Sequence, residues 1–180
     1  MIVLTNDVFQ MPQIDFEEVM NYLLETGKRT HQLWLTDDSL GFIARGREYR
    51  SEFHINPSYE VQVSLKGHQD LIYRTPDGEI KTAHMPEGTC LFTPPFVPHS
   101  PRFGPDAFQF IIERARKPGE LDRFHWFCPK CDNFLHEEEY YVGDYTNDPV
   151  GQAYANFYNN EEHRTCKECG TVIPAPDGNL

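Results

Sequence analysis

Apolar spacing along the chain predicts one helix near the N-terminus, followed by a long β-rich segment. In IDFEEVMNYLLETGK, five apolar residues recur at helical intervals on one face: Ile14, Val19, Met20, Leu23 and Leu24. Asp15 and Glu18 occupy capping-box positions, and Gly27 is a typical stop signal. The pattern therefore predicts an amphipathic helix with its apolar face against the rest of the protein.

From about residue 30 to residue 114 the pattern changes to short β-rich runs. These runs are HQLWL, LGFIA, EVQVSLKG, DLIYR, IKTAHM, CLFT and FQFIIER. The stretch TPDGE between two of them predicts a hairpin connection. The proline-rich segment from Phe92 to Asp106 predicts a rigid passage from strand to loop at a barrel rim. Many short strands of this kind indicate a mainly β fold, a double-stranded β-helix or jelly-roll barrel.

The composition shifts after residue 117 toward aromatic, acidic and cysteine-bearing sequence. We therefore expect residues 1–117 to form a barrel with an N-terminal helix, and residues 118–180 to form an extension folded around cysteines. Within the extension, DRFHWF is expected to pack against the barrel.

Four of the five cysteines form two C-x-x-C pairs: Cys128 with Cys131, and Cys166 with Cys169. Four thiolates at this spacing predict a reduced, tetrahedral metal site rather than a disulfide framework, and the spacing does not choose between iron and zinc. A closed four-ligand site has no open position for chemistry, so we expect a structural role. The remaining Cys90 is expected to be a small buried core residue.

Charge and hydropathy narrow the possible partners. The chain has 28 acidic against 16 basic residues and a formal net charge of -12, which argues against nucleic acid and against an anionic membrane surface. No apolar run approaches the roughly 20 residues of a membrane span, and the N-terminus does not resemble a signal peptide. The expected location is the cytoplasm, with small molecules or proteins as partners.

Two spaced motifs in the β-rich segment predict a second metal site. The first contains His54, Glu60 and Gly67; the second contains Gly88, Pro94 and His99. Both resemble the paired motifs of the cupin superfamily, except that Asn56 stands where many cupins have a histidine and Phe96 where the second motif often has glycine. Two histidines and one carboxylate match the facial triad of non-haem Fe(II) oxygenases, which leaves adjacent coordination positions open. The alternative is that these residues are solvated strand ends and a loop histidine.

Together with the cysteine pairs, four stretches resemble the bacterial type of 3-hydroxyanthranilate 3,4-dioxygenase. They are YRSEFHINPSYE, LFTPPFVPHSPR, IIERARKPGELDRFHWFCPKC and CKECG. The resemblance implies a catalytic Fe(II), a second rubredoxin-like iron site that zinc could also fill, and O2 as co-substrate. It further implies a small aromatic amino-hydroxy acid as substrate and a homodimeric assembly.

The same resemblance assigns roles to further residues. Arg50 and Arg102 would grip the substrate carboxylate, with Arg102 matching only if one loop residue is deleted, and Glu113 would lie near the reacting amino and hydroxyl groups. Bidentate guanidinium contacts suit a carboxylate, and a glutamate beside an amino group can move a proton. Surface solvation is the alternative for both arginines.

Three positions depart from the family pattern. Gln62 and Ser64 replace an aromatic residue and a glutamine, and Thr30 stands where an asparagine is expected. Because of these departures, the protein could instead be a ring-cleaving dioxygenase that acts on another 2-aminophenol or on a catechol. A non-catalytic cupin that binds a carboxylate, and a zinc-ribbon interaction module with an inert barrel, are further alternatives. The histidines outside the motifs are expected to be structural: His31, His68, His84, His125, His136 and His163.

Overall fold

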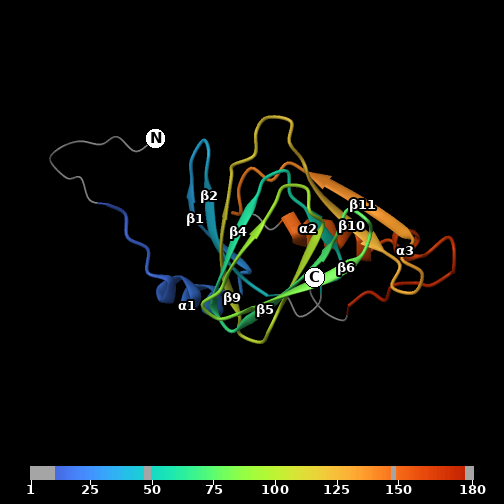
Figure 1. The fold of residues 1–180 in the computed structure, drawn as a ribbon, viewed down its shortest axis with the longest axis horizontal. Helices are drawn as coiled ribbons and strands as arrows, with labels where there is room; N and C mark the ends of the chain where they lie inside the picture. The colour runs from blue at the N-terminus through green and yellow to red at the C-terminus, as the bar shows by residue number, and fades with distance from the viewer. Residues whose placement is uncertain (1–10, 47–49, 147–148, 177–180) are drawn as a thin grey trace.

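The computed structural model describes residues 11–46, 50–146 and 149–176, which fold around a barrel of two antiparallel sheets (Figure 1). One sheet has the order β1-β2-β9-β4-β7, and the other has the order β11-β10-β3-β8-β5-β6. The strands are β1 Thr30–Leu35, β2 Leu40–Arg45, β3 Phe53–Ile55, β4 Glu60–Lys66, β5 His68–Arg74, β6 Ile80–Pro86, β7 Cys90–Thr93, β8 His99–Phe103, β9 Phe108–Glu113, β10 Asp122–Phe127 and β11 Phe134–Tyr140. This confirms the predicted mainly β, cupin-type barrel.

Within the described residues, three helices accompany the barrel: α1 Phe16–Thr26, α2 Pro149–Tyr158 and α3 Glu161–Arg164. The prediction of α1 is confirmed, since Asp15 caps it by accepting hydrogen bonds from the backbone of its first turn and Gly27 ends it in the left-handed conformation. Leu23 is fully buried against β2 and β9, whereas Ile14 and Leu24 are exposed. The apolar face is therefore narrower than its sequence pattern indicates. None of the described helices is long and apolar enough to cross a membrane.

The sequence predicted most barrel strands but missed β8, β10 and β11. Strand β8 forms at the end of the proline-rich passage and contains Pro101. It pairs with β3 only at His54 and His99. On the β3 side, Pro101 therefore has no paired residue, and such an edge position tolerates a proline. Cys90, at the start of β7, is exposed, so its prediction as a core residue was wrong.

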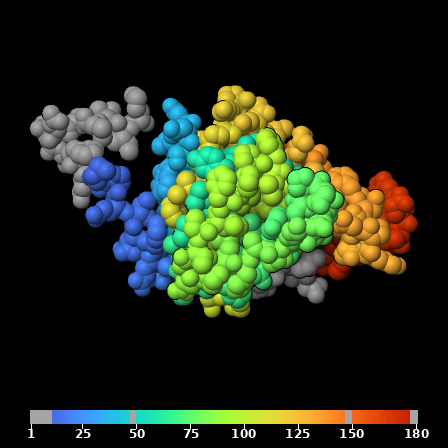
Figure 2. Space-filling view, in the orientation of Figure 1, coloured from blue at the N-terminus to red at the C-terminus, as the bar shows by residue number. Residues whose placement is uncertain are grey.

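The C-terminal extension continues the second sheet instead of standing apart from it. Strand β10 pairs with β3 on one side and with β11 on the other. Its Phe124 stacks on His54 of the barrel, as expected of DRFHWF, whereas Trp126 stacks on Phe157 of α2 within the extension. The boundary after residue 117 stays a prediction, but it does not interrupt the sheet. Figure 2 shows the N-terminal and C-terminal segments on opposite sides of the barrel.

Part of the interior of the barrel is polar. Along β4 the buried positions are Glu60, Gln62 and Ser64, while the valines between them are only half-buried on the outer face. The neighbouring strand β9 likewise buries Gln109 and Glu113. Buried polar groups are costly unless they are hydrogen-bonded, so an interior built from them indicates a functional cavity.

Candidate active site

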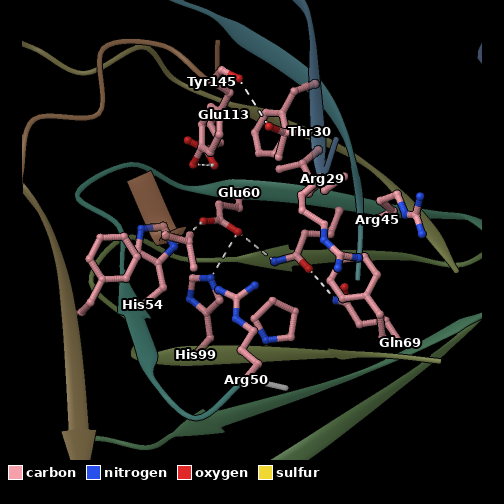
Figure 3. Close-up of a pocket in the computed structure, with 18 residues that line it drawn as sticks. Arg29, Thr30, Arg45, Arg50, His54, Glu60, Gln69, His99, Glu113 and Tyr145 are labelled. Atoms are coloured by element: carbon pink, nitrogen blue, oxygen red, sulfur yellow. Dashed lines mark hydrogen bonds and ion pairs between the residues drawn. The ribbon is translucent and has the colours of Figure 1, made fainter. Parts of the chain in front are cut away.

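The structure brings His54, Glu60 and His99 together from three different strands, β3, β4 and β8. Their side chains are buried, and their nearest ligand atoms all lie within 4.8 Å of one another. Glu60 Oε2 lies 3.3 Å from His99 Nε2, and Glu60 Oε1 lies 3.6 Å from His54 Nδ1 (Figure 3). His54 and His99 are direct partners across β3 and β8, while Glu60 faces them from the other sheet.

The outer nitrogen of each histidine has a fixed acceptor. His99 Nδ1 donates to the Val97 carbonyl at 2.9 Å, and His54 Nε2 donates to the Asp122 carboxylate at 2.7 Å. Since a carbonyl and a carboxylate can only accept, the proton of each neutral ring is held on the outer side. The inner nitrogens are then available as lone-pair donors, the arrangement common in metal sites. The donor set of two imidazoles and one carboxylate therefore fits a divalent metal ion.

Glu60 is held in its ionised form. Burial alone would raise the pKa of its carboxyl, but the charge and hydrogen bond of His99, together with His54 and Asn56, hold the pKa well below its usual value. Asn56 Nδ2 and Gln62 Nε2 each donate to Glu60 at 2.8 Å. Asn56 therefore orients the Glu60 carboxylate instead of adding a further imidazole ligand.

A cavity of about 80 Å³ adjoins the three residues. It is lined by Arg29, Thr30, Phe42, Ala44, Arg45, Arg50, His54, Glu60, Gln62, Gln69, His99, Pro101, Phe103, Ile111, Glu113, Phe124, Tyr145 and Val150. Arg50 lies close to His99 (Figure 3). Its guanidinium pairs with the fully buried carboxylate of Glu52, which in turn accepts a hydrogen bond from the Tyr154 hydroxyl on α2. The structure thus places the Arg50 guanidinium, oriented by Glu52, beside the three candidate metal ligands.

Arg102 does not line this cavity. The residues of β8 that do so are His99, Pro101 and Phe103, and alternate residues of a strand point to opposite faces. Arg102 therefore projects from the other face of β8, and its predicted contact with a substrate carboxylate is not supported by this geometry. Arg29 and Arg45, which the sequence analysis did not single out, line the cavity instead.

Glu113 lies on β9 directly across from Glu60. Arg116 Nη1 donates to Glu113 Oε2 at 2.6 Å and also binds Asp122 through two further nitrogens, while the Tyr145 hydroxyl donates to Glu113 Oε1 at 3.3 Å. Burial raises the pKa of Glu113 to about 7; Glu60 and Asp122 act in the same direction and Arg116 opposes them. A carboxyl with a pKa near neutrality can both accept and return a proton.

The three departures from the family pattern fall in different places. Gln62 and Thr30 line the cavity, with the Thr30 hydroxyl donating to the Tyr145 carbonyl at 3.3 Å. Ser64 is buried deeper in the barrel, where it accepts a hydrogen bond from Gln109 at 3.0 Å, and it does not line the cavity. Gln62 and Thr30 are therefore positioned to affect a bound molecule directly, and Ser64 is not.

The four cysteines of the extension form a second ligand group. Cys128 Sγ lies 3.5 Å from Cys169 Sγ, and Cys131 Sγ lies 3.6 Å from Cys166 Sγ and 3.5 Å from Cys169 Sγ. A tetrahedral metal with sulfur ligands at about 2.3 Å requires edges of about 3.8 Å, so the sulfur positions fit such an ion. Each pair ends in a left-handed residue, Asp132 or Gly170, whose N–H donates at 2.9 Å to the carbonyl of the first cysteine of that pair.

A third group, formed by His136, Glu138 and His163, was not expected from the sequence. The two imidazole rings are stacked, with centroids 3.7 Å apart and planes 15° apart. Because the lone pairs of an imidazole lie in the plane of the ring, stacked rings do not direct them at one ion. We therefore assign His136 and His163 the structural role that the sequence analysis expected of them.

Sequence reasoning missed the residues that orient the site: Glu52, Gln69, Arg116, Asp122, Tyr145 and Tyr154. The signal available for two of them was the alternation of charges in ERARKPGELDRF, where Arg116 and Asp122 stand close to Glu113. Isolated Glu, Gln and Tyr residues carry no comparable pattern, because the contacts that define their roles join segments far apart in the chain.

Comparisons with known proteins agree with this geometry. Residues 29–158 match the family model described as 3-hydroxyanthranilic acid dioxygenase. Curated proteins named 3-hydroxyanthranilate 3,4-dioxygenase include one from Shewanella woodyi, 33% identical with 87% of this chain and 82% of that protein covered. Others are from Bacillus thuringiensis (strain Al Hakam), 31% identical with 87% of each chain covered, and from Candida albicans, 35% identical with 72% and 75% covered.

A cupin-2 domain protein from Shewanella frigidimarina is a solved structure with 16% identity and a TM-score of 0.45, covering 56% of this chain and 93% of that one. The fold follows from the strand order described above, independently of this likeness. Membership rests on the family model, which spans most of the chain, and on the curated relatives. This chain belongs to the 3-hydroxyanthranilic acid dioxygenase family.

Proposed function

We propose that this protein is an Fe(II)-dependent dioxygenase that opens the aromatic ring of 3-hydroxyanthranilate to give 2-amino-3-carboxymuconate semialdehyde, using both atoms of O2. The observation that carries the proposal is the convergence of His54, Glu60 and His99 on a buried cavity that also contains Arg50 and Glu113. The names of the curated relatives support the same reaction. Two imidazoles and one carboxylate favour iron, with coordination positions left for substrate and O2.

A bound Fe(II) would bring substrate and O2 together and let electron density pass from one to the other. The protein's own contribution begins with orientation. Asp122 holds the His54 ring, and the Val97 carbonyl holds the His99 ring. Asn56 and Gln62 hold the Glu60 carboxylate. A rigid ligand set needs little reorganisation when substrate arrives.

Arg50 is the residue we assign to the substrate carboxylate. It lines the cavity beside His99, and its guanidinium is oriented by Glu52. Tyr154 in turn donates a hydrogen bond to Glu52. A guanidinium in a fixed orientation binds a carboxylate with geometric specificity, and this holds the ring with its amino and hydroxyl groups toward the metal ligands. Arg29 and Arg45 add two further positive charges to the lining of the same cavity, although the chain as a whole is acidic.

Glu113 is the residue we assign to proton movement at the substrate's amino and hydroxyl groups. It lies across from Glu60 and is bound by Arg116 and Tyr145. The apolar walls formed by Phe42, Ile111 and Phe124 exclude water from the ring. The cysteine group offers no open position, so we propose that its iron or zinc holds the extension together.

Oxygen uptake tests the proposal directly. Protein loaded with Fe(II) anaerobically should consume one O2 per 3-hydroxyanthranilate, with the semialdehyde appearing in its ultraviolet absorbance. Glu113→Gln should still bind iron but turn over about a hundredfold more slowly, because it cannot exchange a proton. No uptake by protein with a full iron site would contradict the proposal.

A second candidate is ring cleavage of another 2-aminophenol or of a catechol, which is favoured by the buried Gln62 in the cavity wall. A panel of such rings in the same assay separates the two candidates. We also propose that the enzyme is cytoplasmic and that it is a homodimer, the assembly that the family resemblance implies. Sedimentation at assay concentrations measures the assembly, and a monomer there would contradict it.

A further inference from the structure

Two glutamine side chains extend the hydrogen-bonding of Glu60 along the cavity wall. Gln62 Nε2 donates to Glu60 Oε2 at 2.8 Å, and Gln69 Nε2 donates to Gln62 Oε1 at 2.7 Å (Figure 3). Gln62 is 2% exposed and Gln69 is 0% exposed, and both line the cavity. We call Gln62 and Gln69 the amide pair.

The direction of these hydrogen bonds is fixed by Glu60. An ionised carboxylate can only accept, so Gln62 must present its NH2 group to Glu60 and its carbonyl to Gln69. Gln69 must then present its NH2 group to Gln62, which leaves the Gln69 carbonyl oxygen facing elsewhere. Rotating either amide by half a turn would bring two acceptors together. The orientation of Gln69 is therefore a consequence of the metal ligand and not a free choice.

The carbonyl oxygen of Gln69 accepts no hydrogen bond from the part of the chain that the structure describes. The NH2 group of Gln69 also contacts the Met85 sulfur at 3.4 Å. This sulfur is a weak acceptor and has no proton to donate to the Gln69 carbonyl oxygen. Buried acceptors are almost always satisfied, and Gln69 lines the cavity, so a donor on a bound molecule would satisfy this oxygen.

We infer that the amide pair selects a ring substrate that carries an additional hydrogen-bond donor, a hydroxyl or an amino group, on the ring edge facing Gln69. The substrate class is a 2-aminophenol carboxylate with one more polar substituent. The inference rests on the ring cleavage of the proposed function, in which the metal ligands and Arg50 would place the ring, and it changes the preferred substrate from 3-hydroxyanthranilate itself to a derivative with the additional donor. An apolar wall at Gln62 and Gln69 would instead favour the unsubstituted ring.

The test is a panel of 3-hydroxyanthranilates with hydrogen, hydroxyl, amino or methyl at ring positions 4, 5 and 6. Binding is measured by anaerobic calorimetry on the Fe(II) protein, and turnover by oxygen uptake. At one ring position the hydroxyl or amino analogue should bind at least about tenfold more tightly than the methyl analogue of similar size, because only the donor satisfies Gln69.

Gln69→Met keeps the length of the side chain and removes its carbonyl acceptor, so it should reduce that preference to within about twofold. Gln109→Met is the matched control. Gln109 is also 0% exposed and has a carbonyl oxygen without a donor among the described residues, but it does not line the cavity. This control should leave the preference unchanged.

The outcomes separate this inference from the proposed function. Absence of oxygen uptake with every analogue would contradict the proposed function, while the calorimetric preference would still report on Gln69. The inference is overturned if no donor-bearing analogue binds better than its methyl counterpart, or if Gln69→Met leaves the preference intact. It is equally overturned if Gln109→Met abolishes the preference to the same extent.

Discussion

The barrel site and the cysteine site are two candidate metal centres that are assembled in opposite ways. His54, Glu60 and His99 come from three strands in two sheets, so their convergence depends on the register of the whole barrel. The cysteines come from two C-x-x-C turns, each with its own backbone hydrogen bonds. The first site requires the complete fold, whereas each half of the second requires only a local turn.

The surroundings of the two sites differ as well. The barrel ligands adjoin a cavity lined by charged, amide and aromatic side chains. The cysteine sulfurs mainly face one another, and four thiolates complete a tetrahedral site. The difference shows where a substrate can bind: a site with fewer protein ligands beside a shaped cavity has room for it, and a site closed by four ligands has no open position.

The largest expected effect comes from removing the carboxylate of the barrel site. Glu60→Ala should lower kcat/KM by at least about a thousandfold, because even the outer partners of metal ligands are worth roughly 10- to 100-fold. Metal analysis should show loss of the barrel metal with the cysteine-bound metal retained. Survival of both iron content and turnover would show that Glu60 is not a ligand.

The next effect concerns Arg50, to which we assign the substrate carboxylate. Arg50→Ala should lower kcat/KM for 3-hydroxyanthranilate by about a hundredfold, because a charge-assisted contact is lost. For 2-aminophenol, which has no carboxylate, the loss should be within about threefold. Arg102→Ala is the comparison variant, and it should change neither substrate by more than about twofold, because Arg102 projects from the opposite face of β8. Equal losses in the two variants would restore Arg102 to the site.

A smaller effect on activity is expected from opening the cysteine site. Cys166→Ser should release about one metal equivalent and lower Tm by about 10 °C, because metal binding contributes to folding of the extension. Activity at low temperature should fall by about tenfold and not vanish, since α2 supports Arg50 through Tyr154 and adds Val150 to the cavity wall but supplies none of the three barrel ligands. Abolished activity in folded protein with an intact barrel metal would show that the cysteine site takes part in the reaction.

The sequence predicted the two ligand groups because the residues of each group stand in short motifs with characteristic spacing of His, Glu or Cys. It could not predict the interior of the barrel. The alternation in EVQVSLK shows that Val61 and Val63 share one face and Glu60 and Gln62 the other, but not which face points inward. Here the polar face is inside, contrary to the usual rule. The role of Gln69 and the participation of β10 likewise depend on contacts between distant segments.

The smallest expected effect tests the link between the two regions. Tyr154 on α2 donates to Glu52, and Glu52 orients Arg50, so Tyr154→Phe should raise KM for 3-hydroxyanthranilate by about fivefold and change kcat by less than about twofold. KM for 2-aminophenol should stay unchanged, because only a substrate with a carboxylate uses Arg50. Tyr158→Phe is the control, since Tyr158 contacts Ser51 instead of Glu52. A purely structural role would lower Tm in either variant and affect both substrates alike. A KM increase confined to the carboxylate substrate, and to Tyr154→Phe, therefore identifies the extension as the support of the substrate-binding arginine.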